Sequence, residues 1–169
     1  MGAKSLKCAG LLIAGILTWT VPSTAHDHKA GSIEIEHPWS RATPPGAPVA
    51  GGYLEIRNVG NEADRLVSAS SDLAASTELH ESTMQDGMMR MRPMAGPLEI
   101  PAGQTVKIGD GNHIMFVKPA RSLRKGETFK ATLTFEKAGA VDIEFLVQGM
   151  GGREAEEALG HGMHGSAAP

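Results

Sequence analysis

The clearest fold signal in the sequence is the stretch TFKATLTFEKAGAVDIEFLV, residues 128–147. In residues 128–136 every second side chain is apolar, and residues 141–147 repeat this alternation after a short turn that contains Gly139. A period of two is typical of β-strands that bury one face. The short turn predicts that the two strands pair as an antiparallel hairpin.

Seven further segments upstream have a similar length and a β-rich composition, and turn residues separate most of them. These segments are residues 33–37, 52–58, 65–69, 77–81, 88–92, 105–108 and 113–118. Short strands at regular spacing favour a sandwich or a barrel. We therefore expect one all-β domain over residues 32–148, a β-sandwich or barrel. A flexible tail is expected over residues 149–169, where glycine and polar residues replace the alternation.

The first 25 residues have the pattern of a signal peptide. Lys4 and Lys7 precede an apolar run that ends at Val21, and small residues follow up to a cleavage site after Ala25. The run is shorter than the roughly 20 apolar residues that span a bilayer, so we expect a mature form that does not span the membrane. A retained membrane anchor is the alternative. Cleavage would also remove Cys8, the only cysteine, and with it any thiol chemistry.

Charge and composition argue against several classes of function. Lys and Arg number 16 against 19 Asp and Glu, and aromatic residues make up 4% of the chain, so nucleic-acid binding is not expected. The sequence contains no P-loop, no dinucleotide-binding fingerprint and no nucleophile elbow. We expect a protein that is not an enzyme.

Methionine is concentrated in one short segment. Five of the eleven residues from position 84 to position 94 are methionine: Met84, Met88, Met89, Met91 and Met94. Core packing is one explanation, because methionine fills gaps in hydrophobic cores. Polar neighbours such as Gln85, Asp86 and Arg90 favour a surface location instead.

Two histidines and a methionine complete a set of candidate metal ligands. Residues two apart on a strand share a face, so His113 and Met115 are expected to point the same way. His80 is expected to face away from its apolar neighbour Leu79. Taken singly, each histidine is more typical of an ordinary surface or edge residue, and it is the combination with exposed methionine that favours a metal site. Thioethers are poor ligands for zinc, calcium or magnesium but good ligands for Cu(I), so imidazole and thioether together predict a Cu(I) carrier.

The spacing His80-x10-Met91-x21-His113-x-Met115 resembles the signature of the periplasmic copper chaperones of the PCu(A)C type. These are cupredoxin-like proteins that bind one Cu(I). The resemblance extends over roughly residues 33–147.

The resemblance implies a cupredoxin-like Greek-key fold, with His80, Met91, His113 and Met115 as the Cu(I) ligands. It also implies a periplasmic role in supplying copper to the CuA centre of cytochrome c oxidase, directly or alongside Sco-type proteins. We expect the chaperone to be a monomer. Asp110-Gly111-Asn112 departs from the glycine pair and aromatic of many relatives, which would alter how the site is shielded from solvent.

Other residues are candidates for auxiliary copper binding. Met84 and Met88 are either additional ligands or core residues. In an N-terminal arm over residues 26–31, cleavage would expose His26 and place His28 third, an arrangement that can hold a second copper as square-planar Cu(II). His161, Met163 and His164 in the tail could likewise collect copper. A solvated arm and a disordered tail are the alternatives.

Three rival functions remain open from the sequence. The first is a periplasmic protein that scavenges copper and confers copper tolerance. The second is a secreted copper enzyme that uses the N-terminal His26. The third is a metal-free binding or structural module, which predicts that no copper is retained on purification.

Overall fold

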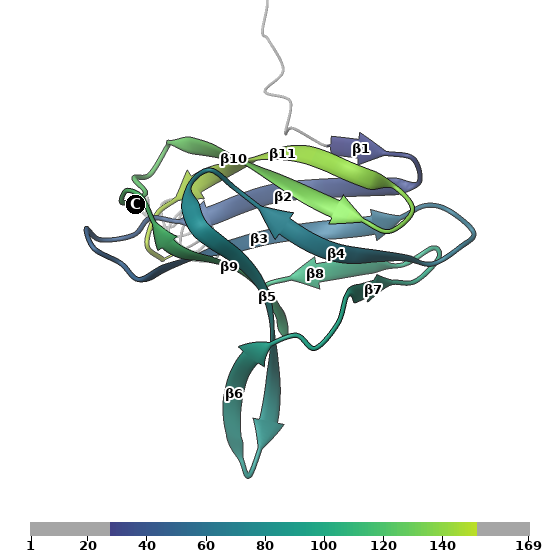
Figure 1. Ribbon diagram of the computed structural model, residues 1–169, viewed down its shortest axis with the longest axis horizontal. Coiled ribbons are helices and arrows are strands. Elements are labelled where there is room, and N and C mark those ends of the chain that lie inside the picture. The colour runs from purple at the N-terminus through teal and green to yellow at the C-terminus, as the bar shows by residue number, and fades with distance from the viewer. Residues whose placement is uncertain (1–27, 152–169) are drawn as a thin grey trace, which may run out of the picture.

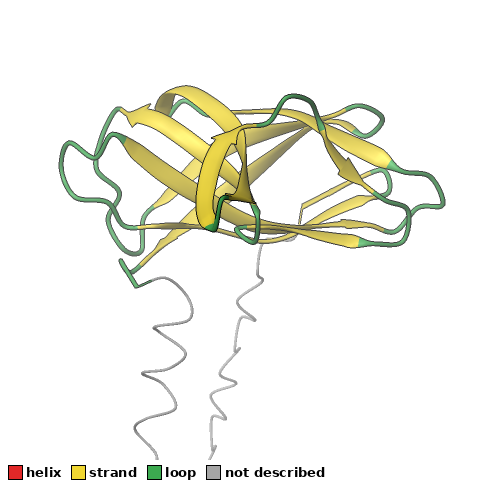
Figure 2. Ribbon diagram, turned by 90° about the horizontal axis from the view of Figure 1, so that it is seen from below, coloured by secondary structure: helices red, strands yellow, loops and turns green. Residues whose placement is uncertain are grey.

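The computed structural model describes residues 28–151, which contain eleven strands and no helix (Figures 1 and 2). The strands are β1 (His28–Ala30), β2 (Ile33–Arg41), β3 (Val49–Asn58), β4 (Asp64–Ser70), β5 (Ala74–Gln85), β6 (Met88–Pro93), β7 (Leu98–Ile100), β8 (Thr105–Ile108), β9 (Asn112–Pro119), β10 (Thr128–Phe135) and β11 (Gly139–Gln148). The predicted signal peptide, His26 and all but the first three residues of the predicted tail lie outside the described residues. Within residues 28–151, no helix is long and apolar enough to cross a membrane.

The prediction of an all-β fold is confirmed, and each of the nine predicted strands is present. The hairpin of β10 and β11 has the expected pairing, with Phe129 opposite Phe145 and Leu133 opposite Val141. Two strands of three residues, β1 and β7, were not predicted. Strand β1 pairs with β2, so the sheet begins at His28, inside the segment expected to be an arm.

Ten of the eleven described strands form one hydrogen-bonded path, β6-β5-β9-β8-β3-β2-β11-β10-β4-β7, which folds over to enclose a core (Figure 2). Strands distant in sequence become neighbours, as where β11 runs parallel to β2, and such crossovers are typical of Greek-key connections. Phe116 of β9 packs edge-on against Phe129 of β10 and Phe145 of β11. The two layers of the sandwich therefore meet at these three aromatic rings.

A bulge in β2 explains why its sequence signal ends early. Ile33 and Ile35 are fully buried, but the register shifts between Glu36 and Trp39, and His37 adopts a φ of 51°. Beyond the bulge the even-numbered Ser40 is buried, so the alternation has changed phase. The bulge also places Trp39 opposite Tyr53 of β3.

The hairpin of β5 and β6 projects from the body of the sandwich (Figure 1). Strand β6 is the edge of the sheet and pairs only with β5 among the described strands, and all six of its residues are exposed. Asp86 and Gly87, with φ values of 53° and 76°, form a two-residue turn of the kind that favours tight hairpins. The methionine-rich segment therefore lies on an exposed, projecting ribbon.

Candidate metal centre

The two candidate histidines lie side by side on adjacent strands. His80 of β5 is directly opposite His113 of β9, and Glu78 is directly opposite Met115. Because side chains alternate along a strand, the two histidines and Met115 share one face. Ile114, between the last two, is completely buried. This face is therefore the outer face of the sheet, as expected from the sequence.

Met91 comes to the same face from the other side of β5. It pairs with Ser82, which is two residues from His80 and so points the same way. Met91 is 48% exposed, whereas the side chain of His80 is only 17% exposed. The four residues predicted as ligands thus lie on one face of three neighbouring strands, β6, β5 and β9, with His80 on the central one.

Each imidazole already has a polar partner. The Nε2 atom of His80 lies 2.8 Å from Oε2 of Glu78, and the Nε2 atom of His113 lies 3.2 Å from Oγ of Ser82. A metal that binds either histidine through Nε2 has to replace the corresponding hydrogen bond. A metal that binds through Nδ1 would instead leave these partners in place to orient the rings.

The surroundings of His113, next to His80, lower its pKa and so favour the neutral form of its imidazole. Burial lowers the pKa of His113, the adjacent His80 lowers it further, and Asp110 opposes both effects. A neutral imidazole has a free lone pair, so a lowered pKa keeps His113 able to bind a metal ion at lower pH than an exposed histidine.

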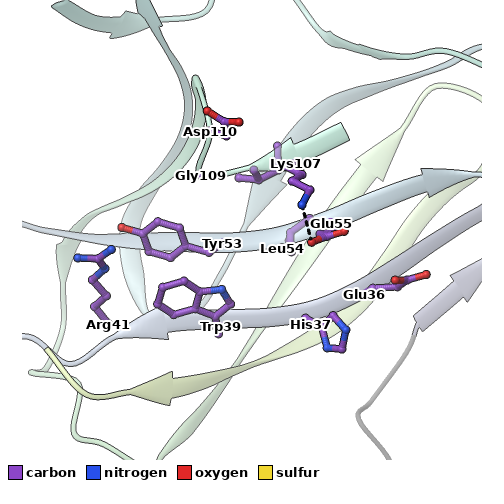
Figure 3. Close-up of a pocket in the computed structure, with 11 residues that line it drawn as sticks. Glu36, His37, Trp39, Arg41, Tyr53, Leu54, Glu55, Lys107, Gly109 and Asp110 are labelled. Atoms are coloured by element: carbon purple, nitrogen blue, oxygen red, sulfur yellow. Dashed lines mark ion pairs between the residues drawn. The ribbon is translucent and has the colours of Figure 1, made fainter. Parts of the chain in front are cut away.

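The stacked side chains of Trp39 and Tyr53 border this face on the β3 side. Gly51 of β3 is opposite Met115, and a Cβ built on Gly51 would lie 3.2 Å from the hydroxyl of Tyr53. The Tyr53 ring stacks on Trp39 with ring centroids 4.2 Å apart, and the Arg41 guanidinium lies over both rings (Figure 3). Trp39, Arg41 and Tyr53 are among the residues that line a cavity of about 510 Å³.

The remaining methionines of the segment divide between three locations. Met84 pairs with Met89, and both lie on the same face as His80. Met88 pairs with Gln85 and points to the opposite face of the hairpin, so the structure does not bring it to the candidate ligands. Met94 is partly buried and packs against the hydrophobic core.

The terminal candidate sites are only partly visible. His28 is the first residue of β1 and is paired with Ile35. The Cu(II) arrangement expected at the N-terminus would need the backbone amide of His28, which now belongs to a strand. His26, His161, Met163 and His164 lie outside the described residues.

The sequence placed Met89 in the methionine-rich segment but did not single it out as a candidate ligand, and it did not indicate the two hydrogen-bond partners, Glu78 and Ser82. Met89 could have been found, because the Asp86-Gly87 turn fixes the register and so pairs Met84 with Met89. Among residues 28–151, no group of three or more His, Cys, Asp or Glu side chains is arranged to hold a metal ion. Besides the two imidazoles, the candidate ligands on this face are the thioethers of Met91 and Met115.

Comparison with known proteins identifies the family of this chain. Residues 33–147 match the family described as "Putative lipoprotein LpqE-like". The protein of Leifsonia xyli subsp. xyli described as "Putative lipoprotein Lxx21020" is 27% identical over 125 residues, which cover 73% of this chain and 74% of the relative.

Two solved structures are similar over 73% of this chain. The copper-bound PCuAC domain from PmoF2 is 29% identical, with a TM-score of 0.62 over 98% of that domain. The Cu(I) form of DR1885 from Deinococcus radiodurans is 27% identical, with a TM-score of 0.52 over 81% of that protein. The chain therefore belongs to the LpqE-like family and has the cupredoxin-like fold of PCuAC domains.

Proposed function

We propose that this protein is a periplasmic copper chaperone that binds one Cu(I) through His80, Met91, His113 and Met115. The observation that carries the proposal is the shared outer face, on which the His80–His113 pair lies between Met91 and Met115. Copper in the similar PmoF2 domain and Cu(I) in DR1885 support the same choice of metal.

The chemistry of this ligand set suits a carrier. Thioethers are soft ligands that favour Cu(I) over zinc, calcium or magnesium. Two imidazoles and two thioethers are neutral, so they hold the ion without the strong charge attraction of a thiolate. A receiver that offers thiolates can therefore take Cu(I) from this site by ligand exchange.

We further propose that the receiver is the CuA subunit of cytochrome c oxidase, reached directly or through a Sco-type protein. Relatives named as lipoproteins support an exported location, where such receivers are found. The position of Met91 on the projecting hairpin supports transfer, because a receiver can approach this protruding ligand before the less exposed His80, His113 and Met115.

Anaerobic Cu(I) titration in competition with a chromophoric chelator tests the binding step. Wild type is expected to hold one tight Cu(I), and Met91→Ala or His113→Ala should lose most of that affinity. Met88→Ala is the matched control, because Met88 lies on the other face of the same hairpin. If Met91→Ala and His113→Ala bind Cu(I) as tightly as wild type, the assigned ligands are wrong.

Delivery has its own test. The Cu(I)-loaded protein is mixed anaerobically with a purified, copper-free CuA domain, and CuA formation is followed by its visible absorption after oxidation. Transfer that is no faster than from a chelator of equal affinity would remove the proposed delivery role while leaving Cu(I) binding intact.

A further inference from the structure

We propose that Met84, Met89 and Met91 form a second Cu(I) site made only of thioethers, which passes the ion to or from the histidine pair. We call these three residues the methionine face. The inference rests on the proposed function and extends it by naming a route. The route runs along the projecting hairpin of β5 and β6 (Figure 1). It ends at His80 of β5.

The register brings the three sulfur-bearing side chains together. Met84 is directly opposite Met89, and Met91 is two residues farther along β6. Residues two apart on a strand are roughly 6.6 Å apart, and diagonal neighbours across an antiparallel pair are about 7–8 Å apart. Methionine has a long, unbranched side chain, so three thioethers at these separations can converge on one ion.

The hydrogen-bond pattern brings the methionine pair closer still. Pro93 has no N–H to exchange with His80, its partner on β5, so that pair is of the non-hydrogen-bonded kind. Pairs alternate along an antiparallel ladder, which makes Ser82–Met91 and Met84–Met89 non-hydrogen-bonded as well. In such pairs the Cα atoms are about 4.5 Å apart and the side chains are closest.

Two backbone hydrogen bonds agree with this assignment. The N–H of Ser82 donates to the carbonyl of Gly111, on the β9 side, at 2.6 Å. The N–H of Met94 donates to the carbonyl of Leu79 at 2.9 Å. Even-numbered residues of β5 thus bond towards β9 and odd-numbered ones towards β6, as the alternation requires.

Burial does not explain these methionines. Met84 is 67% exposed and Met89 is 72% exposed, so neither fills the core. A strand on an exposed ribbon would be better served by β-branched residues if packing alone mattered. The opposite face of the hairpin carries Arg90 and Arg92, with Arg92 donating to Thr83, so the cation would bind on the face without guanidinium groups.

Met91 links the two sites. Its thioether belongs both to the methionine face and to the set proposed around His80 and His113. Transfer is then a stepwise ligand substitution, in which Met91 keeps its bond to the ion. The bonds to Met84 and Met89 break as those to the imidazoles form. Copper stays Cu(I) throughout, and no electron or proton has to be supplied.

The test compares the full chain with a Met84→Leu and Met89→Leu double variant, titrated anaerobically with Cu(I). Leucine keeps the apolar bulk and removes only sulfur. Met88→Leu is the matched control on the other face. The readouts are the NMR signals of the methionine methyl groups and of the His80 and His113 rings, together with the rate of Cu(I) loss to excess chelator.

In wild type, the first equivalent of Cu(I) should shift the histidine ring signals. Because the two sites share Met91, they cannot both be complete at once, so one equivalent of Cu(I) is also added to a His80→Ala and His113→Ala variant, where it should shift the methyl signals of Met84 and Met89. The Met84→Leu and Met89→Leu substitutions should abolish that second event and, with both histidines present, should make the protein release Cu(I) several-fold more slowly, while Met88→Leu behaves as wild type. Unmoved Met84 and Met89 signals, or a double variant that releases copper at the wild-type rate, would overturn the inference. Unmoved histidine signals would instead overturn the proposed function.

Discussion

His80 and His113 are directly paired across β5 and β9, and the Nε2 atom of each is held by a side chain of β5. Because even-numbered residues of β5 form their backbone hydrogen bonds with β9, His80 and His113 are a hydrogen-bonded pair. The Cα atoms of such a pair are about 5.5 Å apart, which lets the two imidazoles reach one ion. Because the paired strands fix this separation, we expect Cu(I) to bind both rings with little rearrangement of the backbone.

The hydrogen bond between Ser82 and His113 makes a prediction about which ring nitrogen binds copper. If Cu(I) binds Nε2, Ser82→Ala removes a competing hydrogen bond worth about 0.5–1.5 kcal/mol and should tighten Cu(I) binding roughly 2–10-fold. Competition titration measures this. Weaker binding in Ser82→Ala would show that Ser82 supports the ring from behind and that Nδ1 is the ligand atom.

The turn of the hairpin should control the position of Met91. Gly87 has a φ of 76°, a conformation that costs about 1–2 kcal/mol for a residue with a side chain, so Gly87→Ala should loosen the hairpin and weaken Cu(I) binding. Gly87→Asn is the control, because asparagine tolerates this region. Equal Cu(I) affinity for Gly87→Ala and wild type would contradict this prediction, because it would mean that Cu(I) binding does not require an ordered hairpin.

Asp64 should make stability depend on pH. Burial raises its pKa, but the N–H groups of Lys137, Arg65 and Ala138, which donate at 2.9, 2.7 and 3.0 Å, outweigh burial and lower it overall. A lowered folded-state pKa gives stability that is present above the unfolded pKa of about 3.9 and is lost as pH falls through the folded value.

Asp64→Asn should therefore cost about 2 kcal/mol of unfolding free energy at pH 7, the range for hydrogen bonds to a charged group. Urea unfolding of both proteins at pH 7 and at pH 3 measures the difference. The difference in unfolding free energy between wild type and Asp64→Asn should be smaller at pH 3 than at pH 7. An equal difference at the two pH values would show that the charge of the Asp64 carboxylate does not contribute to stability.

The stack of Tyr53 on Trp39, beside Met115, should be disturbed by a side chain at position 109, which is glycine. This residue has a φ of 120°, and a Cβ there would lie 2.6 Å from Cδ1 of Tyr53. Gly109→Ala should displace Tyr53 from its stack on Trp39 and change the near-ultraviolet circular dichroism. Gly111→Ala is the control, since Gly111 also has a positive φ but nothing within 4 Å of its Cβ position. Identical spectra for the two variants would contradict the packing described for Tyr53.

The parts of the fold that the sequence predicts are those in which burial alternates along a strand. The hairpin of β10 and β11 is the clearest case. Strand β5 runs to Gln85, well beyond the predicted 77–81, because its outer half leaves the body and buries no face. Strand β7 spans only Leu98–Ile100, too short for a periodic signal.

For the candidate site too, the sequence predicts some features and not others. The shared face of His113 and Met115 follows from strand geometry alone. The pairing of His80 with His113 needs the β5–β9 register, which joins segments about thirty residues apart and cannot be read from local pattern. Glu78 and Ser82 were missed because they look like ordinary polar residues on a strand.

The central claim is that one Cu(I) is bound by two imidazoles and two thioethers. X-ray absorption spectroscopy of the complex with one equivalent of Cu(I) measures this ligand set directly. The account predicts a mixed nitrogen and sulfur shell in wild type and a reduced sulfur contribution in Met91→Leu. A shell of nitrogen and oxygen only, or one of unchanged sulfur content in Met91→Leu, would contradict it.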